Sequence, residues 1–363
     1  METTSAAERR DALAGQLFDA ALGAMDLFGV YLGGRLGLYK SLADEGPLTS
    51  DGLAAAAGIQ ERYAREWLEQ QAVARILDVD DPGAGAHDRR YSIPAGHDEA
   101  LLDESSLSYM IPMARLIVGC VRPIDALVDA FRTGGGVPYA DYGADIYEGV
   151  EGFTRPLFEG LLGSEWLPAV PEIHARLHAD PPARVADLAC GSGRSTLAIA
   201  RAYPNADVDG IDLDAASIAQ ARANLAESGL AERVRFHNRN AADPGLAGRY
   251  DLVTIFDALH DMSRPVDVLR TARGLLAEGG TVFVGDEKNA EAFTLEPADY
   301  ERLNYGFSLL HCLPVGMVGE DPAGTGAVMR PGTVRDYGLA AGFREVEVLP
   351  IENEFWSFYR LTP

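Results

Sequence analysis

The sequence is short of cationic side chains. Its 363 residues include 31 lysines and arginines against 55 aspartates and glutamates, which gives a formal net charge of −24. Binding to a phosphate backbone or to an anionic membrane surface requires clustered Lys and Arg. We therefore expect neither nucleic acid nor a membrane as partner, and we expect the substrate to be a small molecule.

Cysteine and long apolar runs are also scarce. The three cysteines, Cys120, Cys190 and Cys312, form no C-x-x-C pair, so the sequence favours a reducing compartment without a disulfide framework. The N-terminus is polar and lacks a signal-peptide core. The most apolar later run, residues 110–121, is interrupted by Arg115 and is too short to span a bilayer. These features predict a cytoplasmic protein.

Residues 1–100 show the pattern of a winged helix. Residues 14–40 are apolar on most faces, which predicts a helix with partners on several sides and hence a homodimer interface. Residues 48–51 supply an N-cap for a short alanine-rich helix that Gly58 ends, and a longer helix follows over residues 60–77. A Gly/Asp turn and a short strand complete the order of three helices and a hairpin.

DNA binding is the obvious function of a winged helix, but the charge pattern argues against it. The first hundred residues carry nine Lys and Arg against seventeen Asp and Glu, a balance of −8, and the helix that would read DNA contains Glu61, Glu66 and Glu69. We interpret the unit as a dimerisation and substrate-lid module. A winged-helix regulator that senses a metabolite stays the alternative, and tight, salt-sensitive DNA binding in a gel shift would support it.

Residues 101–182 predict helices with irregular joints, which we interpret as a linker and lid. Three consecutive glycines, residues 134–136, follow Arg132 and precede two tyrosines. Ordering three glycines costs backbone entropy, so such a run is expected where another segment must approach the backbone closely. It is either a flexible turn or a lid in which Arg132 holds a substrate carboxylate in a bidentate pair. Pro181 and Pro182 mark the boundary before the last domain.

Residues 185–195 form the most informative stretch. A short apolar run with Asp187 inside it leads to Gly191 and Gly193, which open an amphipathic helix. A strand, a tight turn and a helix N-terminus suit a nucleotide-like ligand. The third glycine of G-x-G-x-x-G is absent at Thr196, and no G-K-[ST] is present. The pattern that is left is D-x-x-x-G-x-G.

From residue 183 to residue 363 strands and helices alternate, which predicts an α/β fold with a doubly wound, largely parallel sheet. The end of the chain alternates like a closing antiparallel hairpin. The strands are expected at residues 185–189, 208–212, 234–236, 251–256, 281–284, 344–348 and 355–361.

Polar residues follow the second and third strands. Asp212 ends the second strand 25 residues after Asp187, where an acid can bind both ribose hydroxyls of a nucleoside. Asp214 is its nearby competitor. In the stretch 238–243 an amide or acid could meet the edge of an adenine base.

In this order and at these spacings, the last half of the chain resembles the class I S-adenosylmethionine (SAM) methyltransferases, which have a Rossmann-like fold. With the winged helix in front, the whole chain resembles their two-domain members that act on small molecules of secondary metabolism. The resemblance implies SAM as cofactor. It also implies cofactor-binding roles for Asp187, Gly191 and Gly193 at the methionine end, Asp212 at the ribose, Asn240 and Ala241 at the adenine, and Phe256 and Asp257 on the far side.

The reaction depends on residues after the fourth strand. Plant-type O-methyltransferases carry a His-Asp pair there, and His260-Asp261 is the matching pair. A neutral His suits proton removal from a phenol or enol near pH 7. This implies an O-methyltransferase of a phenolic or polyketide substrate with His260 as general base. The alternative is that His260 merely caps the strand end.

A second resemblance is to bacterial enzymes that C-methylate α-keto acids of the phenylpyruvate type with a metal held by two histidines. The matching residues are His260 and His311, which would hold Fe or Zn. The metal would acidify the β-C–H of the substrate. Asp261 would take the proton or orient His260, and Arg132 would hold the carboxylate. His311 could instead be a packed histidine, and Cys312 is expected to point elsewhere.

Overall fold

The computed structural model describes residues 5–363, which divide into two compact units. The first contains the chain up to Val118 together with Glu148–Phe153. The second contains Gly119–Tyr147 and Thr154–Pro363. The segment expected as a separate linker, residues 101–182, is therefore shared between the two units, because its helices pack with whichever core their apolar faces meet.

The first unit has the predicted order of helices and hairpin. Thr49 caps its third helix by accepting the backbone N–H of Gly52, and Gly58 ends that helix in a left-handed conformation at φ 67°. The two short strands pair antiparallel. Its elements are α1 (Ala6–Arg35), α2 (Leu38–Glu45), α3 (Ser50–Ala57), α4 (Glu61–Val73), β1 (Asp78–Val79), β2 (Tyr91–Ser92) and α5 (His97–Leu102).

Helix α1 packs on its own unit only near its C-terminal end. There the Trp67 indole N–H donates to the Gly29 carbonyl at 2.9 Å, and Gly33 lies against the rings of Tyr39 and Trp67. Towards the N-terminus its large apolar side chains are exposed within this chain. By length and composition α1 could also cross a membrane. Its exposed apolar residues are Leu13, Leu17, Phe18, Leu22, Met25 and Leu32.

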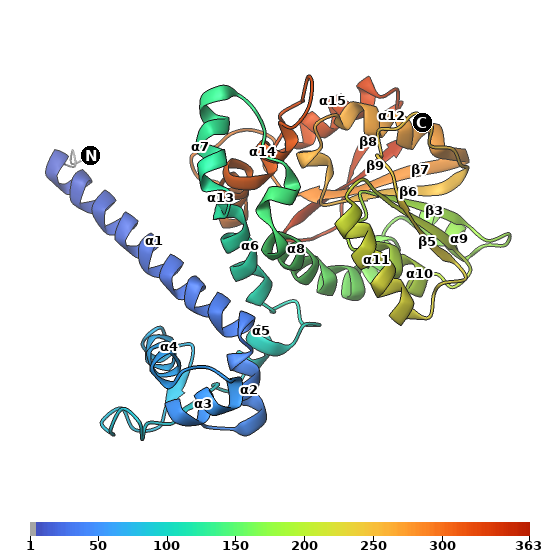
Figure 1. Ribbon diagram of the computed structural model, residues 1–363. Helices are drawn as coiled ribbons and strands as arrows, with labels where there is room; N and C mark the ends of the chain where they lie inside the picture. The colour runs from blue at the N-terminus through green and yellow to red at the C-terminus, as the bar shows by residue number, and fades with distance from the viewer. Residues whose placement is uncertain (1–4) are drawn as a thin grey trace. The chain divides into compact units, whose positions relative to one another are not determined.

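The second unit is built on a seven-stranded sheet of order β5-β4-β3-β6-β7-β9-β8 (Figure 1). All neighbours are parallel except β9, which runs antiparallel to both β7 and β8 and confirms the predicted closing hairpin. The strands are β3 (Arg184–Leu188), β4 (Asp207–Asp212), β5 (Val234–Asn238), β6 (Tyr250–Phe256), β7 (Leu276–Glu287), β8 (Glu345–Leu349) and β9 (Trp356–Thr362).

The strand order reverses at β3, because the chain runs outward from β3 to β5 and then returns to pair β6 on the other side. Ligands of such sheets bind beyond the carboxyl ends of the strands at this reversal. Helices α6 (Ile111–Val121) and α8 (Ala144–Leu157) are each divided between the two units. The other helices of the second unit are α7 (Ile124–Thr133), η1 (Tyr139–Tyr142), η2 (Phe158–Trp166), α9 (Pro171–His178), α10 (Arg194–Ala202), α11 (Ala215–Ser228), η3 (Leu259–Asp261), α12 (Pro265–Leu275), α13 (Asp299–Phe307), η4 (Ser308–Cys312), α14 (Leu313–Gly316) and α15 (Pro331–Ala340).

Candidate functional site

Asp187 fixes the glycine-rich loop to the sheet. It is 1% exposed, and its Oδ2 accepts hydrogen bonds from the hydroxyls of Ser195 and Thr196, both at 2.6 Å. Its Oδ1 accepts the hydroxyl of Thr254 at 2.8 Å. These three hydrogen bonds give Asp187 a structural role, and the cofactor contact implied by the resemblance stays a prediction. Asp187 shapes the loop that faces a ligand.

The two glycines of the loop meet different requirements. Gly193 has a φ of 78°, caps helix α10, and would push a Cβ into the ring of Phe236. Gly191 has a φ of 52° and faces open space, since a Cβ there would meet no atom within 4 Å. Gly193 thus allows close helix–sheet packing, and Gly191 leaves room for a ligand backbone to approach.

Asp212 lies half-buried at the tip of β4 beside this loop. Its Oδ2 accepts the backbone N–H of Gly191 at 2.9 Å, and its Oδ1 accepts that of Asp214 at 2.8 Å. Burial raises the pKa of its carboxyl, although both backbone hydrogen bonds work against the shift. Its competitor Asp214 is engaged elsewhere, because it caps α11 through Ser217 and accepts the Tyr147 hydroxyl at 3.3 Å. The geometry suits a ribose at Asp212.

The adenine-side residues lie in the turn after β5. Asn240 is exposed, and its side-chain oxygen accepts the N–H of Ala242 at 2.8 Å, whereas Ala241 is 7% exposed and belongs to the core of the sheet. Asn238 donates to the carbonyls of Asp212 and Leu213 and so ties this turn to β4. The structure thus places the turn beside Asp212.

Phe256 has a packing role. Its ring is 5% exposed and lies among Phe158, Phe283 and Trp356, with centroid separations of 5.5, 5.9 and 6.3 Å. Phe256 is the last residue of a strand buried on both faces, and its ring lies in the core. Its expected role in closing the cofactor site stays a prediction. Asp257, the next residue, has a left-handed φ of 50° and remains half-buried.

His260 forms a buried dyad with Asp286, a residue at the end of β7 that sequence reasoning missed. The His260 Nδ1–H donates to Asp286 Oδ1 at 2.7 Å, and the two side chains are 4% and 0% exposed. Asp286 also accepts the backbone N–H of Leu259 at 2.9 Å and of Glu287 at 2.8 Å. Burial alone would lower the pKa of His260, but the charge and hydrogen bond of Asp286 raise it well above its ordinary value.

His311 lies close enough to His260 for the two imidazoles to influence each other. Burial, with the charge of His260 as the second cause, lowers the pKa of His311 to about 3, so the ring is neutral. It is 7% exposed, its Nδ1 lies 3.7 Å from Cys312 Sγ, and its buried Nε2 has no partner among the residues described. The structure therefore brings the two predicted histidines together and leaves one nitrogen of His311 unused.

Cys312 also belongs to this cluster, contrary to expectation. Its thiol hydrogen-bonds to His260 and raises the imidazole pKa, while burial raises the thiol pKa to about 11. The expectation failed because residues 308–312 form a π-helix, in which two successive side chains can border the same space.

Three further acids surround His260. Burial raises the pKa of Asp257 to about 7 and that of Asp261 to about 6, and the charge of His260 opposes both shifts. Glu287 hydrogen-bonds to Asp257, and its pKa lies well above the ordinary value, mainly because of burial. The carboxyl pair therefore retains a proton near neutral pH.

The glycine run before this cluster is a close approach rather than a flexible turn. Residues 134–142, here called the strap, lie against η4 and α14: Val137 N–H donates to the Pro314 carbonyl at 2.9 Å, and the Tyr142 hydroxyl donates to the Leu310 carbonyl at 2.9 Å. A Cβ on Gly136 would meet Val318 N at 2.5 Å. The strap brings two tyrosine rings against His311, Tyr139 at 5.4 Å and Tyr142 at 4.6 Å between centroids.

Arg132 is not directed at this cluster. Its side chain is 72% exposed and pairs with Asp129 of the same helix at 3.2 Å. The structure thus does not support the expected carboxylate clamp, because a residue in the last turn of an exposed helix points to solvent. Glu320, an acid nine residues after His311 that could have faced the same site, is also exposed.

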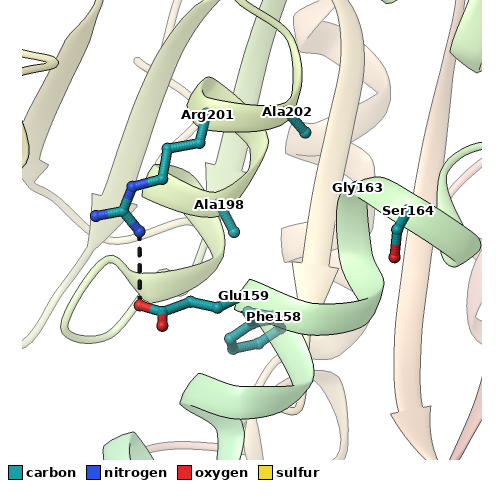
Figure 2. Close-up of a pocket in the computed structure, with 7 residues that line it drawn as sticks. All are labelled: Phe158, Glu159, Gly163, Ser164, Ala198, Arg201 and Ala202. Atoms are coloured by element: carbon teal, nitrogen blue, oxygen red, sulfur yellow. Dashed lines mark ion pairs between the residues drawn. The ribbon is translucent and has the colours of Figure 1, made fainter. Parts of the chain in front are cut away.

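Two other clusters in the described residues hold no predicted site residue. A hollow of about 480 Å³ lies between η2 and α10. Figure 2 shows side chains that line it, among them Phe158, Glu159 and Arg201. Its charged groups pair with each other, Arg201 with Glu159 at 3.5 Å. In the first unit, His87 lies 3.0 Å from Asp51 and 3.4 Å from Glu61 on an exposed surface.

Residues 179–314 match the family described as "Methyltransferase domain", and residues 23–102 match the "Rv2258c-like winged HTH domain". The ubiquinone biosynthesis O-methyltransferase of Ralstonia nicotianae is 30% identical over 184 residues, 49% of this chain and 71% of that protein. The Pseudomonas aeruginosa enzyme of the same name is 33% identical over 111 residues, 30% of this chain and 47% of its own length. For several curated relatives the chain thus spans about half of their length or less.

Solved structures share the whole architecture. Human N-acetylserotonin methyltransferase in complex with SAM superposes with a TM-score of 0.70 at 18% identity, over 100% of this chain and 99% of that one. The mitomycin 7-O-methyltransferase MmcR gives 0.68 at 20% identity, over 98% and 99%. At these identities the likeness concerns the fold, a winged-helix unit followed by a Rossmann-like domain.

Proposed function

The chain belongs to the SAM-dependent methyltransferases, and from this premise we propose that it methylates the β-carbon of a small α-keto acid with the help of a metal ion held by His260 and His311. The observation that carries the proposal is the unused Nε2 of His311, a neutral imidazole nitrogen in a side chain 7% exposed. A buried polar atom without a partner is costly, so a ligand is expected to satisfy it.

The residues fit a metal in three respects. His311 is neutral, as a metal ligand must be. His260 Nδ1 is held by Asp286, so a metal would bind the other ring nitrogen and would replace the hydrogen bond that Cys312 makes with His260. Two protein ligands would leave coordination positions for the two oxygens of an α-keto acid. A metal there would supply Lewis acidity that weakens the β-C–H bond of the substrate.

The chain's own residues would prepare the transfer. SAM supplies the methyl group as an electrophile, and the loop at Gly191 with Asp212 would hold its nucleoside. Asp261, half-buried beside His260 with a pKa of about 6, suits removal of the β-proton near neutral pH. Asp286 would keep His260 in one orientation, because it is itself held by two backbone N–H groups.

O-methylation of a phenolic hydroxyl is the second candidate, and the His260–Asp286 dyad favours it. In its neutral form, an imidazole oriented by a buried carboxylate can accept the proton of an acidic hydroxyl without any metal, and a raised pKa makes His260 a stronger base once it has lost its own proton. Several curated relatives are named O-methyltransferases. In this function His311 would be only a packed neighbour of His260.

One experiment separates the two. The purified protein, with its metal content measured, is incubated with ¹³C-methyl SAM and either phenylpyruvate or catechol, and the methyl position is read by NMR. The keto-acid proposal expects bound Fe or Zn, a β-methyl product, and loss of both in His311→Ala. His178→Ala, which removes an exposed histidine of α9, is the matched control. Methylation of catechol oxygen by protein free of metal, unchanged in His311→Ala, would select the second function.

The winged-helix unit is proposed to serve assembly rather than DNA binding. Its helix α4 pairs its cations internally, Arg62 with Glu66 and Arg65 with Glu61 at 3.3 Å. Cations already paired within their own helix contribute little to phosphate binding. This supports a module without nucleic acid as partner, and a gel shift at low salt tests it.

A further inference from the structure

Tyr139 belongs to the strap and lies near both Asp212 and the histidine cluster. It opens η1 between the two anchors of the strap, Val137 and Tyr142. Both anchors hydrogen-bond to carbonyls at the end of η4 and in α14, so Tyr139 is fixed relative to His311.

The ring of Tyr139 contacts groups on both sides. Its edge packs on Tyr147 at 4.9 Å and on His311 at 5.4 Å between centroids. Tyr147 in turn donates to Asp214 at the start of α11, on the nucleoside side of the sheet. Tyr139 therefore lies between the place expected for the nucleoside and the place where the acceptor would be activated.

The hydroxyl of Tyr139 is free to bind a ligand. Among residues 5–363 it makes no hydrogen bond, and the side chain remains half-buried. Burial is the main reason why its pKa lies well above the ordinary value, and the charges of Asp261, Asp212 and Asp257 add to the shift. Since even an unperturbed phenol has a pKa of about 10, the group is a neutral O–H donor near pH 7.

An acceptor that loses a proton here becomes an anion beside several carboxylates, because Asp261, Asp212 and Asp257 are among the charges that act most strongly on Tyr139. Its negative oxygen needs a hydrogen-bond donor that does not ionise. In a reaction without a metal, His260 supplies a cationic donor once it carries a proton; with or without a metal, Tyr139 is placed to supply a neutral one. A phenol suits this task because it donates strongly and, when buried, stays protonated.

Resting on the proposed function, we propose that Tyr139 is a further catalytic residue, whose hydroxyl donates a hydrogen bond to the acceptor oxygen that becomes negative when the acceptor is deprotonated. The proton stays on Tyr139 throughout, and no covalent bond to it forms or breaks. The role applies equally to the enolate oxygen of an α-keto acid and to a phenolate, since both carry the charge on oxygen.

The test is Tyr139→Phe, which keeps the ring and removes only the donor. Binding of phenylpyruvate and of catechol is measured by calorimetry on the full chain with S-adenosylhomocysteine bound, and turnover is measured with SAM. A hydrogen bond to a charged group predicts about tenfold weaker binding of the acceptor that the wild type binds, and a fall in kcat of about tenfold or more. The Kd for S-adenosylhomocysteine and the melting temperature should not change.

Tyr203→Phe is the matched control, because it removes another phenolic hydroxyl of the same unit, one that bonds His174 outside the site. The inference is overturned if Tyr139→Phe binds and methylates the acceptor within twofold of the wild type, which would mean that only the ring matters. If the wild type methylates the oxygen of catechol and Tyr139→Phe weakens catechol binding, keto-acid methylation is refuted, whereas the proposed role of the Tyr139 hydroxyl is supported. A wild type that binds neither probe refutes both.

Discussion

Asp286→Asn is the sharpest probe of the site, because it removes one charge and leaves the shape. Asp286 accepts three hydrogen bonds, from His260, Leu259 and Glu287. An Asn can accept on only one of its two terminal atoms, so at least one buried donor must face an NH₂ group. The cost of one unsatisfied buried donor is about 1–3 kcal/mol. For a domain of this size that corresponds to a fall of about 2–4 °C in melting temperature for each kcal/mol.

The pH dependence of stability should change more distinctively. The wild-type pKa of His260 is raised above its unfolded value, so its contribution is complete below about pH 6.5 and is lost as pH rises through the folded pKa. Without the charge of Asp286, burial dominates and the pKa falls below the unfolded value. The mutant then loses stability as pH falls instead. Each proton involved changes the slope by up to about 1.4 kcal/mol per pH unit.

The assay is a set of melting curves from pH 5.5 to 8.5 for both proteins, together with kcat on the acceptor identified by NMR. The difference in stability between wild type and mutant should shrink as pH rises. Loss of the oriented imidazole should lower kcat by roughly 100-fold or more. Parallel melting curves and a kcat within about threefold of the wild type would refute the dyad as the functional centre.

Further expectations concern the loop, the core beneath it and the assembly. Gly193→Ala places an alanine in the left-handed region and its Cβ against the ring of Phe236. We therefore expect the free energy of unfolding in urea to fall by about 1–3 kcal/mol and the KM for SAM to rise. An unchanged KM would contradict the assigned loop geometry. Asp187→Ala leaves three buried hydroxyls without their acceptor and should cost about 3 kcal/mol by the same measurement, with wild-type stability as the opposing result. We propose that a second copy of the chain covers helix α1, because this helix is about 45 Å long and exposes six large apolar side chains. The double variant Phe18→Glu, Leu22→Glu should therefore convert a homodimer into monomers, as measured by light scattering. A monomeric wild type would contradict this proposal. Metal uptake should increase with pH, since His260 must lose its proton before it can bind a metal, and uptake independent of pH would argue against His260 as ligand.

The sheet and the cofactor loop could be read from local patterns. Each of the seven strands lies within three residues of its predicted start, apart from β7, which begins five residues earlier, because buried parallel strands are short apolar runs bounded by turn residues. Helix α3 begins after Thr49 and ends at Gly58, as expected, because capping depends on one or two neighbouring residues.

The partners of each side chain could not be read in the same way. Asp187 and Phe256 were both expected to contact the cofactor. In the structure the carboxylate of Asp187 accepts hydrogen bonds from hydroxyls of the protein, and Phe256 lies in an aromatic core. Arg132 had the right chemistry for a carboxylate but lies on an exposed helix face. In each case the direction of the side chain is set by packing with residues far along the chain.

The sequence by itself determined the fold, the cofactor loop, and the position of His260 at the carboxyl end of a strand. These features follow from short-range periodicity, capping and turn chemistry. Only the tertiary structure decided that Asp286 orients His260, that Cys312 and His311 lie beside it, and that the strap holds Tyr139 against them. The physical reason is that a pKa, an unused nitrogen or a free hydroxyl depends on burial and on charges that come from distant segments.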